Sequence, residues 1–196
     1  MALDVCRSSL TAAVIILAVT LAALPAAWAQ QGYPSRPVKI IVPFPAGGTA
    51  DVMPRIFSDW LSKKWGQPVV IENRTGAAGN IGAEAVAKAE PDGYTLLSAP
   101  PPPLVINHNL YPKLGFDPTE FVPIVIMGRV PNALVINPKL PVKGIAELIA
   151  YAKANPGKLT SATQGNGTTS HLTSELFQLM AGVKFQHVPY RGSAPA

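Results

Sequence analysis

The chain has 196 residues, of which 48% are hydrophobic and 14% are charged, and its formal net charge is +5. The hydrophobic share is typical of globular proteins and excludes intrinsic disorder. A single cysteine excludes a disulfide-stapled small fold, and the lack of a Gly-X-Y period excludes collagen. The lysines are scattered rather than gathered in a stripe, which disfavours a nucleic-acid surface.

The first 29 residues have the pattern of a Sec-type export signal. Arg7 supplies the positive charge, an apolar run covers residues 13–24, and Ala27-Trp28-Ala29 forms a small-x-small cleavage site. The alternative, a membrane anchor, needs about 20 apolar residues, and this run is shorter. We therefore expect cleavage after Ala29. The lone Cys6 leaves with the signal, which excludes thiol catalysis and cysteine metal sites from the exported chain.

After the signal, β-branched runs alternate with helical patterns. Strands are expected over residues 38–42, 69–71, 94–98, 121–127, 133–136, 159–163 and 185–188, and helices through 53–61, 81–89, 145–154 and 170–180. Trp60 and Trp65 are expected to pack the core side of the first helix. The prolines at 100–103 are expected to exclude both helix and central strand. The alternation predicts an α/β protein with βαβ units on mostly parallel sheets.

The expected elements divide the chain into two α/β lobes. Two strands follow each other without a helix near residues 128–131, so we place the first lobe at 30–130 and the second at 131–196. The sequence stops directly after a strand, with neither a terminal helix nor a polar tail. We therefore expect both lobes to be incomplete.

Two glycine-containing loops follow expected strands and precede expected helices. The first contains Gly47-Gly48-Thr49 and the second contains Gly165-Asn166-Gly167. Glycine permits a positive φ and a close approach of the backbone, and a helix N-terminus offers free N–H groups to an anion. Ligands of α/β sheets bind at the carboxyl ends of the strands. Neither phosphate-loop fingerprint is present, which disfavours nucleotide binding.

Two side chains near these loops each allow two interpretations. Asp51 is either the N-cap of the first helix, with Pro54 at its third position, or a ligand contact. His171 either donates to an anion or is an ordinary surface histidine. His108 and His187 have no carboxylate nearby in the sequence, which disfavours a metal site.

Several ordered sequence blocks carry a family resemblance. They are Tyr33 to Phe44, Ala46-Gly47-Gly48, Asp51 and Arg55, Gly66 to Arg74, Gly76-Ala77, Gly79 to Gly82, Pro91 to Leu97, Ala154 to Leu159, Gly165 and Gly167, Ser170-His171-Leu172, and His187 to Gly192. In this order they resemble the Bug family, the TctC-like periplasmic solute-binding proteins of tripartite tricarboxylate transporters. The resemblance covers the whole chain after the signal.

This resemblance implies a two-lobed, type II-like periplasmic binding protein with a ligand cleft between its α/β lobes. It implies a monomeric, non-catalytic receptor that captures a small carboxylate, closes around it by a hinge and delivers it to membrane permease subunits, without a metal or cofactor and without nucleic acid. The ligand-binding residues that it implies are Phe44, Ala46, Gly47, Gly48, Thr49, Asp51, Gly165, Gly167, Thr168, Thr169, Ser170 and His171.

Two departures from the family pattern concern the ligand and the length. Pro100 to Pro103 replace small polar residues that usually face the cleft, and Pro54 replaces a residue that is usually free to donate. Relatives return from the second lobe to complete the first, and that return is missing after Gly192. Two rival interpretations are a fragment without function and an exported α/β enzyme. An enzyme needs a nucleophile–base pair or a metal cluster, and Ser170-His171 lacks the Gly-x-Ser-x-Gly setting.

Overall fold

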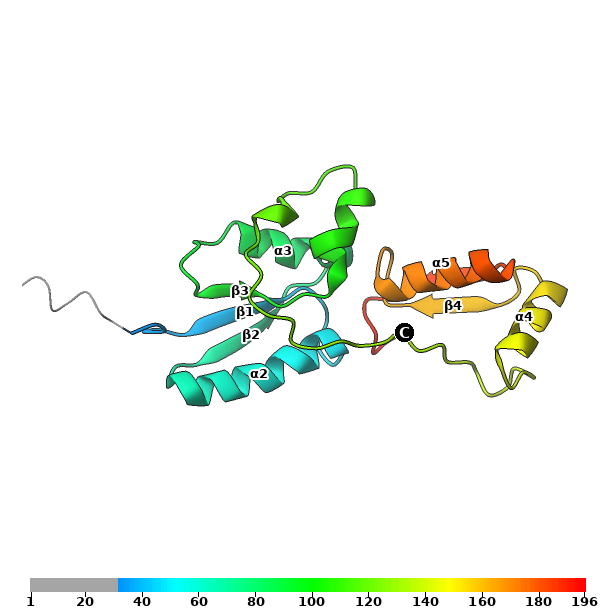
Figure 1. The fold of residues 1–196 in the computed structure, drawn as a ribbon, viewed down its shortest axis with the longest axis horizontal. Coiled ribbons are helices and arrows are strands. Elements are labelled where there is room, and N and C mark those ends of the chain that lie inside the picture. The colour runs from blue at the N-terminus through cyan, green and yellow to red at the C-terminus, as the bar shows by residue number, and fades with distance from the viewer. Residues whose placement is uncertain (1–31) are drawn as a thin grey trace, which may run out of the picture. The chain divides into compact units, whose positions relative to one another are not determined.

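A computed structural model describes residues 32–196, so the export signal predicted over residues 1–29 lies outside the described residues. Residues 36–196 form one compact unit. It contains two separate parallel sheets, one of three strands and one of two (Figure 1). Among the helices of residues 32–196, none is both long and apolar enough to cross a membrane.

The first sheet has the order β2-β1-β3, and all of its strands are parallel. Its elements are β1 (Val38–Val42), α2 (Thr49–Trp65), β2 (Val69–Asn73), α3 (Asn80–Ala87) and β3 (Thr95–Leu97). The chain passes from β1 to β2 on one side and then crosses back over β1 to β3 on the other side. Right-handed crossovers in these opposite directions place α2 and α3 on opposite faces of the sheet, as Figure 1 shows. The predicted order of strands and helices is confirmed here.

The core of this sheet lies between β1, β2 and one side of α2. Val38, Ile40 and Val69 are buried, and Leu61 and Trp65 pack against them. The prediction for Trp65 is therefore confirmed, but the prediction for Trp60 is wrong, because its side chain is 56% exposed. Trp60 lies outside this core, and the ammonium of Lys64 sits 4.7 Å from the centre of its ring.

The proline run after β3 is helical, which corrects the expectation that it excludes a helix. Pro101 has φ −52° and ψ −31°, and a single π-helical turn follows over Pro102–Ile106. Proline is compatible with the first turn of a helix, because its φ is already suitable and the N–H groups there need no helical partner. Pro102 and Pro103 are fully buried.

Three further short helical turns border this region. They are 3-10 turns at Ala77–Gly79, Asn107–Asn109 and Pro118–Glu120. The strands predicted over 121–127 and 133–136 do not form, and residues 121–136 belong to no helix or strand. Their apolar side chains are exposed, with Ile124 at 76% and Val135 at 84%. A β-branched sequence forms a ladder only beside a partner strand, and no strand of the described residues lies beside this segment.

The second sheet consists of two parallel strands joined by a helix. Its elements are α4 (Ile145–Ala154), β4 (Thr160–Thr163), α5 (Thr169–Ala181) and β5 (Gln186–Pro189). β4 and β5 pair from Thr160 opposite Gln186 to Thr163 opposite Pro189. α5 ends at Gly182, whose φ of +64° gives the left-handed conformation common at helix ends. These elements confirm the prediction for residues 145–189, while the lobe boundary at residues 130–131 stays a prediction.

Candidate functional site

The first glycine loop joins the carboxyl end of β1 to the start of α2. Pro43 and Phe44 are buried beneath it, whereas Ala46, Gly47 and Thr49 are exposed. Gly47 has a φ of +87°, which a side chain would strain. The order β2-β1-β3 makes the carboxyl ends of β1 and β3 the switch point where sheets of this kind bind ligands. The loop therefore stands at the expected place.

The first two N–H groups of α2 have no hydrogen-bond partner in residues 32–196. The helix begins after Gly48, and the N–H groups of Asp51 and Val52 bond to the Gly48 carbonyl. The N–H groups of Thr49 and Ala50 make no hydrogen bond within the described residues. They lie at the positive end of the helix dipole, where an anion is stabilised by about 0.3–1 kcal/mol for an exposed end.

Asp51 holds the first loop from beneath. Its carboxylate accepts hydrogen bonds from the Gly47 N–H (3.0 Å), from the Asn73 amide (2.8 Å) and from the Arg55 Nε (2.9 Å). Arg55 also bonds to its second oxygen, at 2.9 Å, and the Asn73 amide reaches the Phe44 carbonyl at 2.9 Å. Strand β2, helix α2 and the loop are therefore connected through one carboxylate.

The structure corrects one of the two interpretations of Asp51, the N-cap, while the other, a ligand contact, stays a prediction. Asp51 is the third residue of α2 and not its N-cap, because the helix begins two residues earlier at Thr49. Pro54 therefore lies inside the helix, where it is fully buried. Asp51 is 2% exposed and both of its oxygens are bonded, so it positions the loop rather than offering a free group. The hydrogen bond from Arg55 lowers the pKa of Asp51 to about 2, against the effect of burial.

The second glycine loop joins the carboxyl end of β4 to the start of α5. Gly165 and Gly167 have φ values of +128° and +74°, so both glycines are required by the backbone. Thr168 is the N-cap and is buried, and its hydroxyl donates to the Gly165 carbonyl at 2.7 Å. The N–H groups of Thr169 and Ser170 have no hydrogen-bond partner in residues 32–196. Each of the two glycine loops therefore leads into a helix whose first N–H groups have no partner in the described residues.

The polar side chains of this second loop mostly bond to the loop itself. The Ser170 hydroxyl accepts from the Gln164 N–H at 3.1 Å and lies 3.1 Å from the Thr168 hydroxyl. The Nδ1 of His171 accepts from the Gly167 N–H at 3.1 Å. The predicted site residues 165–171 are thus brought together, but three of their side chains shape the loop instead of projecting free donors.

His187 lies next to the second glycine loop, and the sequence did not indicate it as a site residue. Its Nε2 lies 2.6 Å from the hydroxyl of the buried Thr163, and that oxygen accepts from the Gly165 N–H at 3.3 Å. Burial and the nearby His171 lower the pKa of His187. The sequence position of His187 could have indicated this role. His187 lies in the strand after α5, and in a βαβ unit that strand pairs beside β4 and so lies near the loop that follows β4.

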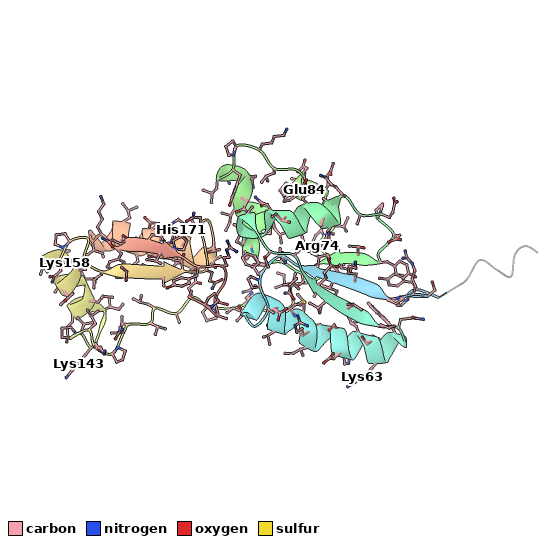
Figure 2. The ribbon with its side chains drawn as sticks, turned by 180° about the vertical axis from the view of Figure 1, so that it is seen from behind. Lys63, Arg74, Glu84, Lys143, Lys158 and His171 are labelled. Atoms are coloured by element: carbon pink, nitrogen blue, oxygen red, sulfur yellow. The ribbon has the colours of Figure 1, made fainter. Side chains whose placement is uncertain are left out.

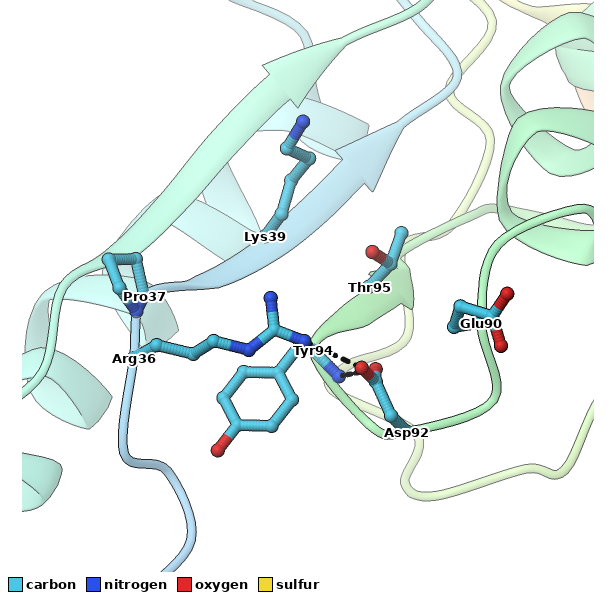
Figure 3. Close-up of a pocket in the computed structure, with 7 residues that line it drawn as sticks. All are labelled: Arg36, Pro37, Lys39, Glu90, Asp92, Tyr94 and Thr95. Carbon is cyan, nitrogen blue, oxygen red and sulfur yellow. Dashed lines mark hydrogen bonds and ion pairs between the residues drawn. The ribbon is translucent and has the colours of Figure 1, made fainter.

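A hollow of about 300 Å³ lies at the opposite end of the first sheet, where β1 begins (Figure 3). Its cationic side chains already have partners. Arg36 pairs with Asp92 at 2.6 Å and lies 4.1 Å from the ring centre of Tyr94, and Lys39 pairs with Glu72 at 2.9 Å. This hollow is therefore a weaker candidate for an anion than the two loops. No group of residues in 32–196 that could hold a metal ion was found.

Two parallel α/β sheets, each with a glycine loop and a helix start at its carboxyl edge, are features of α/β solute-binding proteins. Residues 53–196 match the family model described as tripartite tricarboxylate transporter family receptor, and the chain belongs to this family.

Similar proteins of known sequence or structure agree with this assignment. Protein BugT of Bordetella pertussis is 44% identical over 186 residues, which are 94% of this chain and 57% of BugT. The structure of R. palustris Rpa4515 with adipate matches with a TM-score of 0.81 and 43% identity, over 84% of this chain and 55% of that one. MatC from Rhodopseudomonas palustris with bound malate matches with a TM-score of 0.76 and 32% identity, over 83% and 56%. The chain therefore spans about half the length of the relatives that it matches.

Proposed function

We propose that this chain forms the carboxylate-gripping part of a periplasmic receptor that delivers its ligand to the permease subunits of a tripartite transporter. The observation that carries the proposal is the pair of free helix starts, at Thr49-Ala50 and at Thr169-Ser170, each at the carboxyl end of a parallel strand. Relatives with adipate and with malate support a small carboxylate as the ligand.

The two loops suit a carboxylate because they offer fixed donors and partial positive charge. Hydrogen bonds to a charged group contribute roughly 1.5–3 kcal/mol each, and a few of them give micromolar affinity, about −8 kcal/mol. The proposed site is Phe44, Ala46 to Thr49, Gly165 and Gly167 to Ser170, with Asp51 and His171 as supports. A ligand bonded by both loops favours the state in which both are engaged, which is the basis of hinge closure.

We further propose that the protein acts as a monomer and is not an enzyme. The export pattern of residues 1–29 supports a periplasmic location. Ser170 and His171 are adjacent in the sequence, but the Ser170 hydroxyl bonds to Gln164 and Thr168, while the His171 Nδ1 bonds to Gly167. This arrangement does not supply the nucleophile–base pair that an acyl-transfer enzyme needs.

A proline substitution at the first helical position tests directly whether the free main-chain N–H groups hold the carboxylate, a role called the amide grip below. Thr49→Pro and Thr169→Pro each remove one free N–H, and the preceding residues, Gly48 with ψ 170° and Thr168 with ψ 162°, already have the extended backbone that proline requires. Each variant should bind adipate about 10- to 150-fold more weakly by calorimetry, the equivalent of 1.5–3 kcal/mol.

The matched control is Ile145→Pro, which makes the same change at the start of α4, after Gly144 with ψ 175°. It should leave adipate binding unchanged. Thr49→Ala separates the effect of the hydroxyl from that of the N–H. If the two loop variants keep their circular dichroism spectra and bind adipate as tightly as the control does, the amide grip is refuted.

A further inference from the structure

Two histidines meet beneath the second glycine loop. His171 lies in the first turn of α5 (Figure 2), and His187 lies on β5. Their rings are stacked, with centroids 4.0 Å apart and planes within 12° of parallel. The His171 ring bonds directly to the loop at Gly167, and the His187 ring bonds to Thr163 at the end of β4, so the pair connects the helix, both strands and the loop.

The bond made by His171 requires an unprotonated ring nitrogen. Its Nδ1 accepts the N–H of Gly167, which is buried and has a φ of +74°. A histidine accepts at Nδ1 only when that nitrogen carries no proton, so the neutral ring has its proton on Nε2. That Nε2 faces Glu175, 3.8 Å from its Oε1. Protonation of Nδ1 therefore breaks the contact that fixes Gly167.

His187 acts on the other glycine through Thr163. Its Nε2 is 2.6 Å from the Thr163 hydroxyl, whose oxygen accepts the Gly165 N–H. Thr163 is 2% exposed, so the bond is shielded from water. The Gly165 N–H is in this way held by a hydroxyl whose orientation depends on His187.

The charged groups that face this pair are few. Glu175, on α5, faces His171. The two histidine rings face each other, one from α5 and one from β5, and β4 contributes Thr163, which carries no charge. Burial and the charge of His171 both lower the pKa of His187, while Glu175 raises it. A second proton on the pair would place two cations 4.0 Å apart with one carboxylate beside them, which is unfavourable.

We propose that His171 and His187 are positioning residues that, as a neutral stacked pair, fix the Gly165 and Gly167 amides of the second loop, and that acid releases this loop. The positioning itself is independent of any ligand. Its consequence, weaker carboxylate capture in acid, rests on the proposed function.

Nuclear magnetic resonance of the full chain tests the positioning without a ligand. On acidification the amide signal of Gly165 should move together with the ring signals of His187, and that of Gly167 together with the ring signals of His171. His187→Phe keeps a ring for stacking and should abolish the pH-dependent change of the Gly165 amide signal. His171→Phe should abolish that of Gly167.

Two further variants keep the test decisive. His171→Asn supplies an acceptor that does not titrate, and should keep the Gly167 signal at its neutral-pH position even if the phenylalanine variants fail to fold. The control His108→Gln changes the histidine of the Asn107–Asn109 turn. In this variant the Gly165 and Gly167 amide signals should depend on pH as they do in the unaltered chain. Glycine signals that do not follow the histidines, or a Gly167 signal whose pH dependence is unchanged in His171→Asn, overturn the proposal.

Adipate calorimetry at pH 7.5 and pH 5.5 tests the consequence. The unaltered chain should lose at least fivefold in affinity at the lower pH, and His171→Asn, which keeps only the His187 contact sensitive to acid, should lose less than the unaltered chain. Equal or tighter binding in acid by the unaltered chain refutes the coupling to ligand capture. If adipate binds to no variant at pH 7.5, the proposed function fails, while the glycine signals still decide the positioning role.

Discussion

Arg55 grips the buried carboxylate of Asp51 with two parallel bonds, from Nε to Oδ2 at 2.9 Å and from Nη2 to Oδ1 at 2.9 Å. Both residues lie on α2, one turn apart, and the carboxylate in turn holds the Gly47 N–H of the first glycine loop. A two-bond fork is stronger and more directional than a single contact. The shape of the first loop therefore depends on a charge pair that does not itself belong to the proposed ligand contacts.

Acid should weaken the fold through Asp51. Its pKa is about 2 in the folded chain against 3.8 for an unperturbed aspartate, so the unfolded chain takes up a proton first. The stabilisation is complete above about pH 5 and is lost as the pH falls from there towards 2; for a shift of this size it is of order 2 kcal/mol. Asp51→Asn should show this loss at pH 7 in urea unfolding, and the gap from the unaltered chain should close near pH 2.

Asp59→Asn is the matched control for that measurement, because Asp59 is an exposed carboxylate on the same helix. It should change the free energy of unfolding by less than about 0.5 kcal/mol, as surface substitutions usually do. A gap between Asp51→Asn and the unaltered chain that stays constant from pH 7 to pH 2 would contradict the role given to the Asp51 charge.

Gly82→Ala should separate α3 from the loop that follows β1. A Cβ at this position would lie 2.7 Å from the Cβ of Pro43 and 2.8 Å from the Arg74 carbonyl oxygen, and backbone atoms cannot move aside as a side chain can. Overpacking of this kind costs typically 1–3 kcal/mol. Gly32→Ala, which meets no atom within 4 Å, should be close to neutral. Equal denaturation midpoints for the two variants would show that the contact yields without cost.

The exposed apolar segment at residues 121–127 should make the chain prone to aggregate at high concentration. Val122, Ile124 and Ile126 are 85%, 76% and 76% exposed, and the segment carries no charge to discourage pairing. Exposed apolar segments with strand-forming sequences are aggregation sites, and a charge interrupts them. Ile124→Lys should raise the concentration at which light scattering first appears. Lys139→Gln, at an exposed polar position, should not raise it.

The strands, helices and both glycine loops of residues 38–98 and 145–189 could be predicted, because each depends on a local pattern of burial or on a glycine before a helix. The failures have a different physical origin. The segments 121–127 and 133–136 have strand sequences, but pairing needs a neighbour that a local pattern does not reveal. The partners of Asp51 include Asn73, 22 residues away, and His187 is 16 residues from His171. Such contacts appear only when the strands are placed side by side.

The proposed grip on the ligand consists of main-chain N–H groups, and every residue except proline supplies one. Substitutions around the two loops can therefore alter the size, shape and polarity of the space beyond the grip while the grip itself persists. A receptor built in this way can change its ligand during evolution through a few substitutions around the two loops, while the main-chain N–H groups continue to bind the carboxylate. The two helix starts would be the inherited part of the site, and the side chains around them the part open to selection.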